Sequence, residues 1–396
     1  MSKRINGEGN IRKRKDNRWE GRYYDKLDGN RQKSIYGHNQ QEVVRQMQFV
    51  QCKQGNGEYI KHNDILLDVW MDVWIENYSQ HLKPLTVSSY RTIIRNHLKP
   101  TLGHLTLREL TTEIIQNVYN QKSATLSAKT INNIHGCLHM CLRKAVELHN
   151  GYLDYNPADG CSLPKVPEFE IETLENEDVQ SLLSAIDIND IYDQISLIAL
   201  FTGMRQSEIL GLRWKDVDLE YAEANICRQL QKDRTVHTEY DGKYFIGLSP
   251  KGNRNRVIDL PDFVISILKK RKQQQMEDKK RAKEDNAIWL GSSKLNRDLI
   301  FTKPNGDHLV HSTVWARHKK LLKRSNLTPS RFHDLRHSYA TISLSIGENL
   351  KTVQANMGHR SAAFMLKKYG HQTKGMRKAS ANRMQEFIQT QSKDYA

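Results

Sequence analysis

Residues 331–371 concentrate side chains that could act on a phosphate group. His333 and Arg336 are three residues apart and therefore share one face of a helix, and His359 and Tyr369 follow in the same stretch. Histidine transfers protons near neutral pH, arginine binds an anion through two parallel hydrogen bonds, and a tyrosine hydroxyl can serve as a nucleophile. This combination indicates an anion-binding site that contains its own nucleophile.

Apolar residues at helical spacing predict three helices around these groups. Asp334 is a candidate cap of the first helix, because aspartate accepts hydrogen bonds from the first helical N–H groups. The predicted boundaries are Asp334 and Gly347 for the first helix, Gly358 for the end of the second, and Ser361 for the start of the third. Tyr369 would then lie at the end of the third helix, where its hydroxyl can be exposed.

Two basic residues far upstream complete the set. Arg205 follows an apolar helix and is expected near the start of the next one; by itself it would be a surface arginine that pairs with Glu208 at i+3. Lys251 is expected at the tip of a hairpin between strand-like runs, where a lone lysine is usually a solvated edge residue. A role for Arg205 and Lys251 in binding or cleaving a phosphate is indicated only when they are considered together with the residues of 331–371.

The six residues together suit the cleavage of a phosphodiester. In-line attack places negative charge on the equatorial phosphate oxygens, and fixed cations can stabilise that charge without a carboxylate cluster for metals. The tyrosine pKa of about 10 requires nearby cations or a base, and His333 suits the base. Lys251 suits the acid that protonates the leaving alkoxide. No metal and no other cofactor is predicted.

The same segments resemble the sequence boxes of the tyrosine recombinase, or phage integrase, family. TGMRQSEILGL is similar to the first arginine box, SPKGNRNRVIDLP to the lysine hairpin, HDLRHSYAT to the His-x-x-Arg box, MGHRS to the second histidine, and LKKYGH to the nucleophile segment. All five occur in the family's order and spacing. The resemblance covers the whole expected catalytic domain.

The resemblance implies a role for each residue. Arg205, Arg336 and His359 would bind the scissile phosphate, Lys251 would be the general acid, His333 an acid/base, and Glu208 a brace for the arginine box, while Tyr369 would form a 3′-phosphotyrosyl linkage. Such a linkage keeps the bond energy, so a 5′-hydroxyl from another strand can reseal it. Neither ATP nor a metal ion would be needed.

Composition points to a nucleic acid as the partner. The 396 residues include 61 Lys or Arg and 45 Asp or Glu, a net charge of +16 that favours binding to a polyanion. Five cysteines, an odd number, indicate free thiols in a reducing compartment. No apolar run is long enough to span a bilayer, and no signal peptide is recognised. We therefore expect a cytoplasmic protein. The family resemblance implies a bacterial one, associated with the nucleoid when bound to DNA.

The N-terminal stretch has its own basic surplus, with thirteen Lys or Arg against six Asp or Glu in residues 1–55. Alternating runs in residues 10–37, with a turn signal at Asp28-Gly29, predict a hairpin or three-stranded sheet, followed by a helix from Gln40 to about Lys53. The candidate DNA contacts on this sheet are Arg12, Lys13, Arg14, Arg18, Arg22, Arg31 and Lys33. The alternative is a solvated basic tail whose aromatic residues merely pack.

The predicted architecture is multidomain and largely helical. It comprises a small N-terminal β-sheet domain (1–57), an all-α domain (60–165), and a mainly α domain with a small antiparallel sheet (172–396). The resemblance implies that these are an arm-binding, a core-binding and a catalytic domain with the tyrosine recombinase catalytic fold. Two histidines and two cysteines in the core-binding domain, at positions 135–141, point to different helix faces and are not predicted to bind a metal. The charge-dense residues 269–285 are expected to form a solvated helix or mobile insertion.

The resemblance also implies partners. These are double-stranded DNA attachment sites and a homotetramer on DNA, with an excisionase and a host DNA-bending protein as further candidates and no membrane. The C-terminal tail, with an apolar face that includes Met384 and Phe387, would dock on a neighbouring protomer or fold back on its own domain. The alternative functions are a Xer-like recombinase that resolves chromosomes or plasmids, a type IB topoisomerase-like enzyme, and a non-catalytic DNA-binding regulator.

Overall fold

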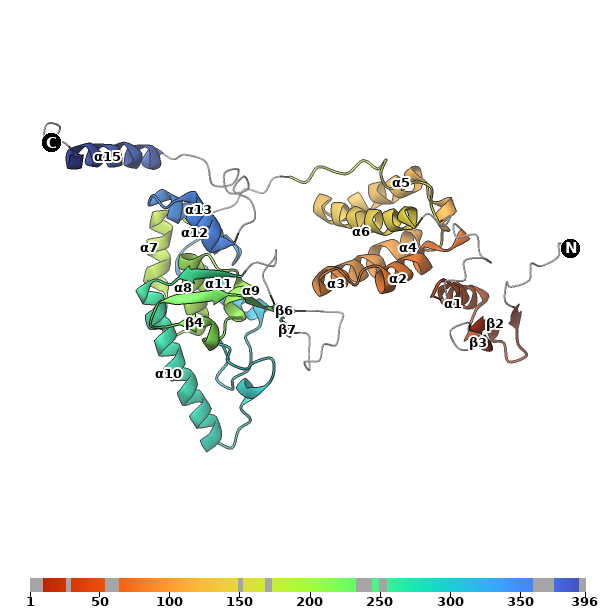
Figure 1. Cartoon of the computed structure of the whole chain (residues 1–396), viewed down its shortest axis with the longest axis horizontal. Coiled ribbons are helices and arrows are strands. Elements are labelled where there is room, and N and C mark those ends of the chain that lie inside the picture. The colour runs from red at the N-terminus through yellow and green to blue at the C-terminus, as the bar shows by residue number, and fades with distance from the viewer. Residues whose placement is uncertain are drawn as a thin grey trace. The chain divides into compact units, whose positions relative to one another are not determined.

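The chain divides into two compact units in the computed structural model (Figure 1), Met1–Glu168 with Arg234–Val236, and Phe169–Asp233 with His237–Ala396. The structure describes residues 10–25, 30–53, 64–148, 152–167, 173–232, 244–248, 255–358 and 374–391. Lys251, His359 and Tyr369 lie outside the described residues. So do the Asp28-Gly29 turn and the helix expected to open at Ser361.

The first unit begins with an antiparallel sheet of order β1-β2-β3, which confirms the predicted three-stranded sheet. Its strands are β1 (Asn10–Lys13), β2 (Trp19–Asp25) and β3 (Arg31–Gly37), and helix α1 (Gln40–Lys53) follows as predicted. Gly21 faces α1 so closely that an added Cβ would lie 2.3 Å from the Met47 sulfur and 2.6 Å from a Val43 methyl carbon. The helix therefore covers one face of the sheet.

The rest of the first unit is a cluster of helices around one core. These are α2 (Leu67–Asn77), α3 (Pro84–Ile93), a π-helical turn (Ile94–Leu98), α4 (Lys99–Leu102), a 3₁₀ turn (Leu107–Glu109), α5 (Thr112–Ser123) and α6 (Ala128–Glu147). Side-chain caps start the last two helices, because the Thr111 hydroxyl accepts from Ile114 N–H and the Ser127 hydroxyl from Thr130 N–H. Trp70 is fully buried and donates its indole N–H to a carbonyl of α6 at 3.1 Å.

The histidines and cysteines of α6 lie on different sides of that helix, as expected. Cys137 and Cys141 are buried in the core. His135 Nδ1 lies 3.3 Å from the Tyr119 hydroxyl, and His139 Nε2 lies 2.7 Å from an Asp159 carboxylate oxygen. Nowhere in the described ranges do three or more histidine, cysteine or acidic side chains gather in a way that could hold a metal ion.

The second unit is mainly helical. Its helices are α7 (Asn176–Ala185), α8 (Ile191–Thr202), α9 (Gln206–Leu210), α10 (Asp262–Glu284), α11 (His311–Arg324), α12 (Asp334–Ser345), α13 (Leu350–Met357) and α15 (Lys374–Gln391), with 3₁₀ turns at Trp214–Asp216 and Leu290–Ser292. Helix α8 is apolar almost all round and packs against both α11 and α12. It is the central helix of the unit's core. None of the helices in the described ranges combines the length and the apolar character that a bilayer crossing requires.

The strands of the second unit form two small antiparallel sheets. One has the order β4-β5-β8, from Val217–Asp218, Glu223–Ile226 and Arg256–Asp259, and the other pairs β6 (Arg228–Lys232) with β7 (Tyr244–Leu248). Strands β5 and β6 follow each other directly in the chain but belong to different sheets. The two strands that flank Lys251 were expected to form one hairpin, but among the described strands β7 pairs with β6 and β8 pairs with β5.

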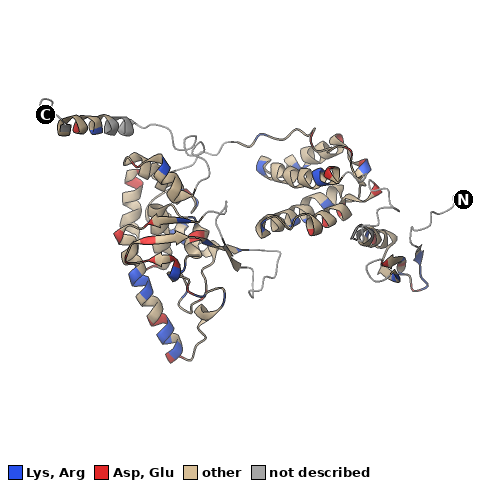
Figure 2. Ribbon diagram, viewed as in Figure 1, with Lys and Arg blue, Asp and Glu red and all other residues tan. Residues whose placement is uncertain are grey.

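The charge-dense residues 269–285 belong to α10 and are not a mobile insertion. Arg271 and Asp278 are 7% exposed, and Arg271 donates to the carbonyl of Thr302 at 3.0 Å. One face of the helix is thus anchored to the unit. Figure 2 colours the positions of the basic residues blue along the ribbon of α10.

Candidate active site

Arg205 lies at the junction of two helices, as predicted. Gly203 ends α8 in the left-handed conformation (φ 64°), and Arg205 occupies the N-cap of α9. Glu208 accepts hydrogen bonds from the Arg205 main-chain N–H at 2.9 Å and from its Nη1 at 2.7 Å. The i+3 pairing expected from the sequence is therefore present, and Glu208, at 1% exposed, is buried beneath the arginine.

A second arginine holds the same carboxylate. Arg256, the first residue of β8, donates from Nη1 and Nη2 to the two oxygens of Glu208 at 3.1 and 2.7 Å. Burial by itself would raise the pKa of Glu208, but the hydrogen bonds and charge of Arg256 and the charge of Arg205 outweigh it and lower that pKa to about 2. Glu208 is therefore ionised at neutral pH. Arg256 is not among the six residues predicted from the sequence to act on a phosphate.

Arg336 is buried, at 1% exposed, and its guanidinium contacts two helix ends. It donates from Nη1 to the carbonyl of Gly203 and from Nη2 to the carbonyl of Met357. Carbonyl groups at helix C-termini carry partial negative charge, so both contacts stabilise a cation. The Arg336 side chain is thereby fixed against Gly203, which lies two residues before Arg205 in the chain.

The charges of Arg205 and Arg336 both act on the imidazole of His333. Burial lowers the pKa of His333, and the charges of Arg336 and Arg205 lower it further. A neutral imidazole can accept a proton, as a general base must. The ring of His337 packs edge-on against His333, with centroids 5.2 Å apart.

The helix that carries His333 and Arg336 starts somewhat differently from the expectation. Helix α12 begins at Asp334, but the N-cap position belongs to His333, whose side chain makes no capping hydrogen bond. The Asp334 carboxylate turns back and accepts from the main-chain N–H of Arg331 at 2.8 Å and from its Nη2 at 2.8 Å. Burial and this arginine hold Asp334 in place, so it is not available as the cap.

Helices α12 and α13 are joined near the end of α13. The predicted stop at Gly358 is confirmed, because that glycine is left-handed with φ 64°. The Asn356 amide donates to the Tyr339 hydroxyl at 3.1 Å. Tyr339 also faces Gly203, where an added Cβ would lie 2.4 Å from the ring.

The structure therefore brings together three of the six predicted residues. Arg205, His333 and Arg336 are linked through Gly203 and through their shared electrostatic environment. A guanidinium pair beside a neutral imidazole can bind an anion and accept a proton. Lys251, His359 and Tyr369 fall outside the described residues, and their placement stays a prediction.

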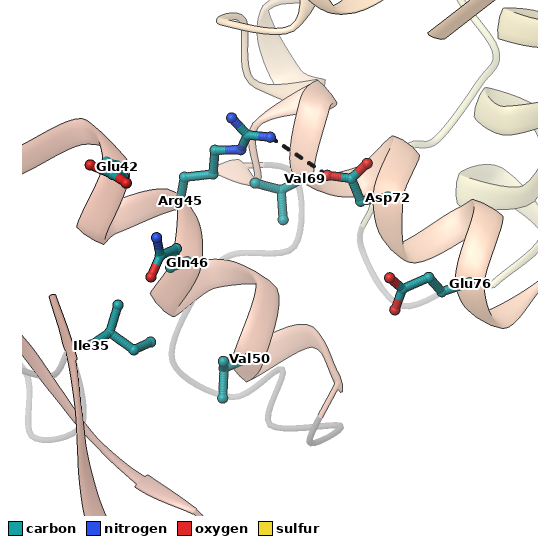
Figure 3. Close-up of a pocket in the computed structure, with 8 residues that line it drawn as sticks. All are labelled: Ile35, Glu42, Arg45, Gln46, Val50, Val69, Asp72 and Glu76. Atoms are coloured by element: carbon teal, nitrogen blue, oxygen red, sulfur yellow. Dashed lines mark ion pairs between the residues drawn. The ribbon is translucent and has the colours of Figure 1, made fainter. Parts of the chain in front are cut away.

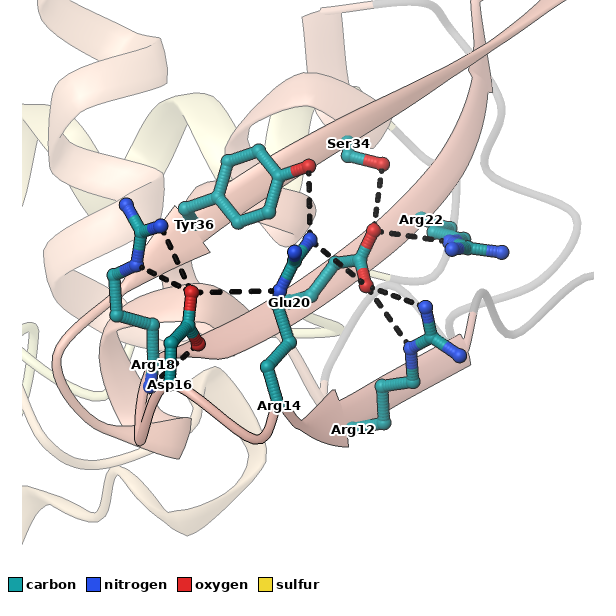
Figure 4. A network of polar contacts seen from close by, with 8 residues as sticks. All are labelled: Arg12, Arg14, Asp16, Arg18, Glu20, Arg22, Ser34 and Tyr36. Carbon is teal, nitrogen blue, oxygen red and sulfur yellow. Dashed lines mark hydrogen bonds and ion pairs between the residues drawn. The ribbon is translucent and has the colours of Figure 1, made fainter.

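The N-terminal sheet gathers several of the predicted DNA contacts around one carboxylate (Figure 4). Glu20 accepts hydrogen bonds from Arg12 Nε at 2.9 Å, Arg22 Nε at 3.0 Å and the Ser34 hydroxyl at 3.1 Å. The hydrogen bonds from Arg22 and Arg12 lower the pKa of Glu20 to about 2. The result is an ordered group of arginines on the sheet face opposite α1.

Two further arginines of the set lie over Tyr36. The guanidinium carbons of Arg14 and Arg18 are 5.4 and 5.8 Å from the centre of its ring. Asp16 accepts from Arg18 at 2.8 Å and lies 3.6 Å from Arg14. These groups belong to the same polar network in Figure 4, where Arg14 also lies 3.8 Å from Glu20.

The remaining three residues of the set lie on the other face. Residues directly opposite in a sheet share a face, and Lys13, Lys33 and Arg31 pair with Trp19, Tyr23 and Asp25, which alternate with Glu20. Lys33 also forms an ion pair with Asp25 at 2.8 Å. The register thus divides the five candidate contacts that lie in strands between two surfaces. Arg14 and Arg18 join the Glu20 face through Tyr36, which pairs with Glu20.

A cavity of about 670 Å³ lies between α1 and α2 (Figure 3). Its polar lining includes the carboxylates of Glu42, Asp72 and Glu76 and the guanidinium of Arg45. Arg45 pairs with Asp68 at 3.1 Å and lies 3.7 Å from Asp72. Because acidic groups predominate, the cavity is unsuited to a phosphate.

Comparison with protein families finds two matching models. Residues 172–376 match the phage integrase family, and residues 67–123 match the N-terminal SAM-like domain of phage integrases. The first match covers slightly more than half of the chain and includes Arg205, His333 and Arg336.

Individual proteins resemble most of the chain. The tyrosine recombinase XerC-like protein of Caldanaerobacter subterraneus subsp. tengcongensis is 29% identical over 350 residues, 86% of this chain and 88% of that protein. The Tn1549 transposon integrase, solved with a circular intermediate DNA, is 21% identical, with a TM-score of 0.64 over 81% of this chain and 99% of that one. The lambda integrase tetramer bound to a Holliday junction is 17% identical, with a TM-score of 0.56 over 94% and 99%.

Proposed function

The chain belongs to the phage integrase family of tyrosine recombinases, and on that premise we propose that it integrates and excises a mobile element. The observation that carries the proposal is that the charges of Arg205 and Arg336 act together on His333, with Arg336 bound to the carbonyl of Gly203 two residues before Arg205. Two fixed guanidinium groups and a neutral imidazole are what metal-independent phosphodiester cleavage requires.

In the proposed reaction, Arg205, Arg336 and His359 bind the scissile phosphate. The Tyr369 hydroxyl attacks phosphorus as its proton passes to His333, and the bond to the 5′-oxygen breaks as Lys251 protonates that oxygen. A 3′-phosphotyrosyl linkage and a 5′-hydroxyl result. A 5′-hydroxyl from another strand then attacks the linkage, releases Tyr369 and reseals the DNA, with no ATP and no metal ion.

The proposed partner is double-stranded DNA at attachment sites, bound by a homotetramer in the bacterial cytoplasm. Support comes from the net charge of +16 and from the fold shared with a transposon integrase on circular intermediate DNA and a lambda integrase tetramer on a Holliday junction. We assign residues 1–57 to arm-site DNA, 60–165 to core-site DNA and 172–396 to catalysis. An excisionase and a host DNA-bending protein are further proposed partners.

A second candidate is a Xer-like recombinase that resolves chromosomes or plasmids. The relative at 29% identity, which carries a XerC-like name, favours it. The basic three-stranded sheet favours an integrase, because resolution at a single core site has no need of a second DNA-binding module. A non-catalytic regulator would be expected to lack the tyrosine or an arginine, and the sequence retains them all.

The DNA that flanks the gene provides the test substrate. Direct repeats at the ends of a mobile element would identify the attachment site, and a nicked duplex of that sequence would trap a covalent adduct. The wild-type protein should form an adduct that survives denaturing electrophoresis, and Tyr369→Phe should bind the duplex but form none. An adduct with Tyr369→Phe would refute the assignment of the nucleophile, and no adduct with the wild type would refute the proposed reaction.

A further inference from the structure

We propose that Arg256 is a positioning residue of the phosphate site, because it holds both the carboxylate behind Arg205 and the last turn of α13. This inference rests on the proposed function. Arg256 is not one of the six predicted catalytic residues.

The first contact of Arg256 is with Glu208. The two arginines share that carboxylate: Arg256 supplies N–H groups at 2.7 and 3.1 Å, and Arg205 supplies its main-chain N–H at 2.9 Å and Nη1 at 2.7 Å. A carboxylate has about four acceptor positions, so the four donors saturate it. The direction in which Glu208 holds Arg205 therefore depends on the donors from Arg256.

The second contact is with the end of α13. Arg256 Nε donates to the carbonyl of Asn356 at 2.6 Å. The guanidinium also lies close to Gly358, where an added Cβ would be 3.2 Å from Nη1. Asn356 is three residues before His359 in the sequence. One side chain thus connects the arginine box to the helix that leads into the predicted second histidine.

Arg256 and Arg205 differ in how deeply their side chains are buried. The Arg256 side chain is 9% exposed and that of Arg205 is 22% exposed. All three nitrogens of the Arg256 guanidinium donate to protein acceptors. Arg205 is therefore the better placed of the two to meet a DNA phosphate, and Arg256 acts through it.

The substitution Arg256→Lys tests this role without removing the charge. Lysine has no planar fork and no Nε donor, so it cannot hold Glu208 through two hydrogen bonds and reach Asn356 as well. A displacement of about 1 Å at a reacting group can cost on the order of 100-fold in rate. We expect the rate of adduct formation to fall by roughly 10- to 100-fold, with DNA affinity changed by less than about threefold.

Arg324→Lys is a matched control. Arg324 donates from Nε to the carbonyl of Ala185, at the end of α7, and from Nη2 to the buried carboxylate of Asp193. It therefore makes the same kind of bridge between a helix end and an acid. Asp193 lies in the first turn of α8, and Gly203 follows the last turn, about 15 Å away at the rise of an α-helix.

Purified full-length wild type, Arg256→Lys and Arg324→Lys would be compared by thermal unfolding, by affinity for the nicked attachment-site duplex, and by single-turnover adduct formation. Amide hydrogen exchange in residues 350–358, without DNA, provides a readout independent of activity. We expect both variants to lose similar stability, and only Arg256→Lys to lose adduct rate and protection in the last turn of α13.

The inference would be overturned if Arg256→Lys formed adducts within about twofold of the rate of Arg324→Lys, or if exchange in residues 350–358 were unchanged. Failure of the proposed function looks different, because the wild type itself would then form no adduct. In that case the exchange measurement alone decides whether Arg256 fixes the end of α13.

Discussion

The guanidinium of Arg336 donates a hydrogen bond to the carbonyl of Gly203, the left-handed residue that ends α8. Its other terminal nitrogen donates to Met357, next to the Asn356 carbonyl that Arg256 holds. The end of α8, the start of β8 and the pair of helices α12 and α13 are therefore joined by the side chains of Arg336 and Arg256. The geometry of the proposed phosphate site depends on these hydrogen bonds as well as on the predicted catalytic residues.

Gly203→Ala should disturb the site and lower stability. The φ of 64° disfavours any side chain, and the new Cβ would lie 2.4 Å from the Tyr339 ring. Chemical denaturation should show a loss of about 1–3 kcal/mol, and adduct formation should fall with it. Gly136→Ala is the control, because nothing lies within 4 Å of a Cβ at that position on helix α6. It should be neutral or stabilise by up to about 1 kcal/mol. Equal effects at the two positions would contradict this account.

Arg205→Lys should reduce cleavage while DNA binding persists. Lysine keeps the positive charge but cannot bind a phosphate through two parallel hydrogen bonds. We expect the rate of adduct formation to fall by on the order of 100-fold, as measured in single turnover on the nicked duplex. Cleavage at the wild-type rate would return Arg205 to the role of a surface arginine paired with Glu208.

Glu208→Gln should change the pH dependence of stability in a defined direction. The arginines lower the pKa of Glu208 from an ordinary value of 4.5 to about 2 despite its burial. Its ionised form therefore contributes stability that is fully present above pH 4.5 and is lost as the pH falls towards 2. In urea denaturation, the stability difference between wild type and Glu208→Gln should be constant near neutral pH and narrow below pH 4.5. A difference that stayed constant down to pH 2 would contradict the assigned pKa.

Local spacing predicted much of the site. The i,i+3 relation related His333, at the N-cap of α12, to Arg336 in the first turn of that helix, and the same relation predicted the contact between Arg205 and Glu208. Arg256 could not be found in this way, because its partners are 48 and 100 residues away in sequence. Long-range strand pairing and the positions of helix ends determine those contacts. The spacing of residues within one helix or strand does not predict them.

The strand register of the N-terminal sheet determines a second feature that the sequence did not predict, namely the face on which each basic residue of its strands lies. The seven basic residues of the N-terminal sheet looked equivalent, because alternation is visible in a sequence but the face that a helix covers is not. Contact between Gly21 and α1 identifies the covered face, and the strand register then assigns the five basic residues that lie in strands to a surface. The capping role expected of Asp334 failed for a similar reason, since Arg331 binds its carboxylate in the folded chain.

The division of the N-terminal sheet predicts unequal effects of two substitutions. Arg12 belongs to the cluster around Glu20 on the face opposite α1, and its side chain is 51% exposed. Lys33 lies on the α1 side and pairs with Asp25. If the Glu20 face binds arm-site DNA, Arg12→Ala should weaken that binding and reduce the slope of log affinity against log salt by about one, and Lys33→Ala should do neither. Titration of an arm-site duplex at several salt concentrations measures both.

Deletion of residues 1–55 extends the same argument to the reaction. The deletion removes the whole basic sheet but leaves Arg205, His333 and Arg336, so cleavage of a bare core-site duplex should stay close to the wild-type rate. Integration, which would require separate arm sites, should be strongly reduced. The control is the Lys33→Ala variant in the full-length protein, which should integrate normally because Lys33 lies away from the Glu20 cluster. Equal loss of core cleavage and integration on deletion would mean that the sheet serves folding or core binding, and would exclude a separate arm-site function.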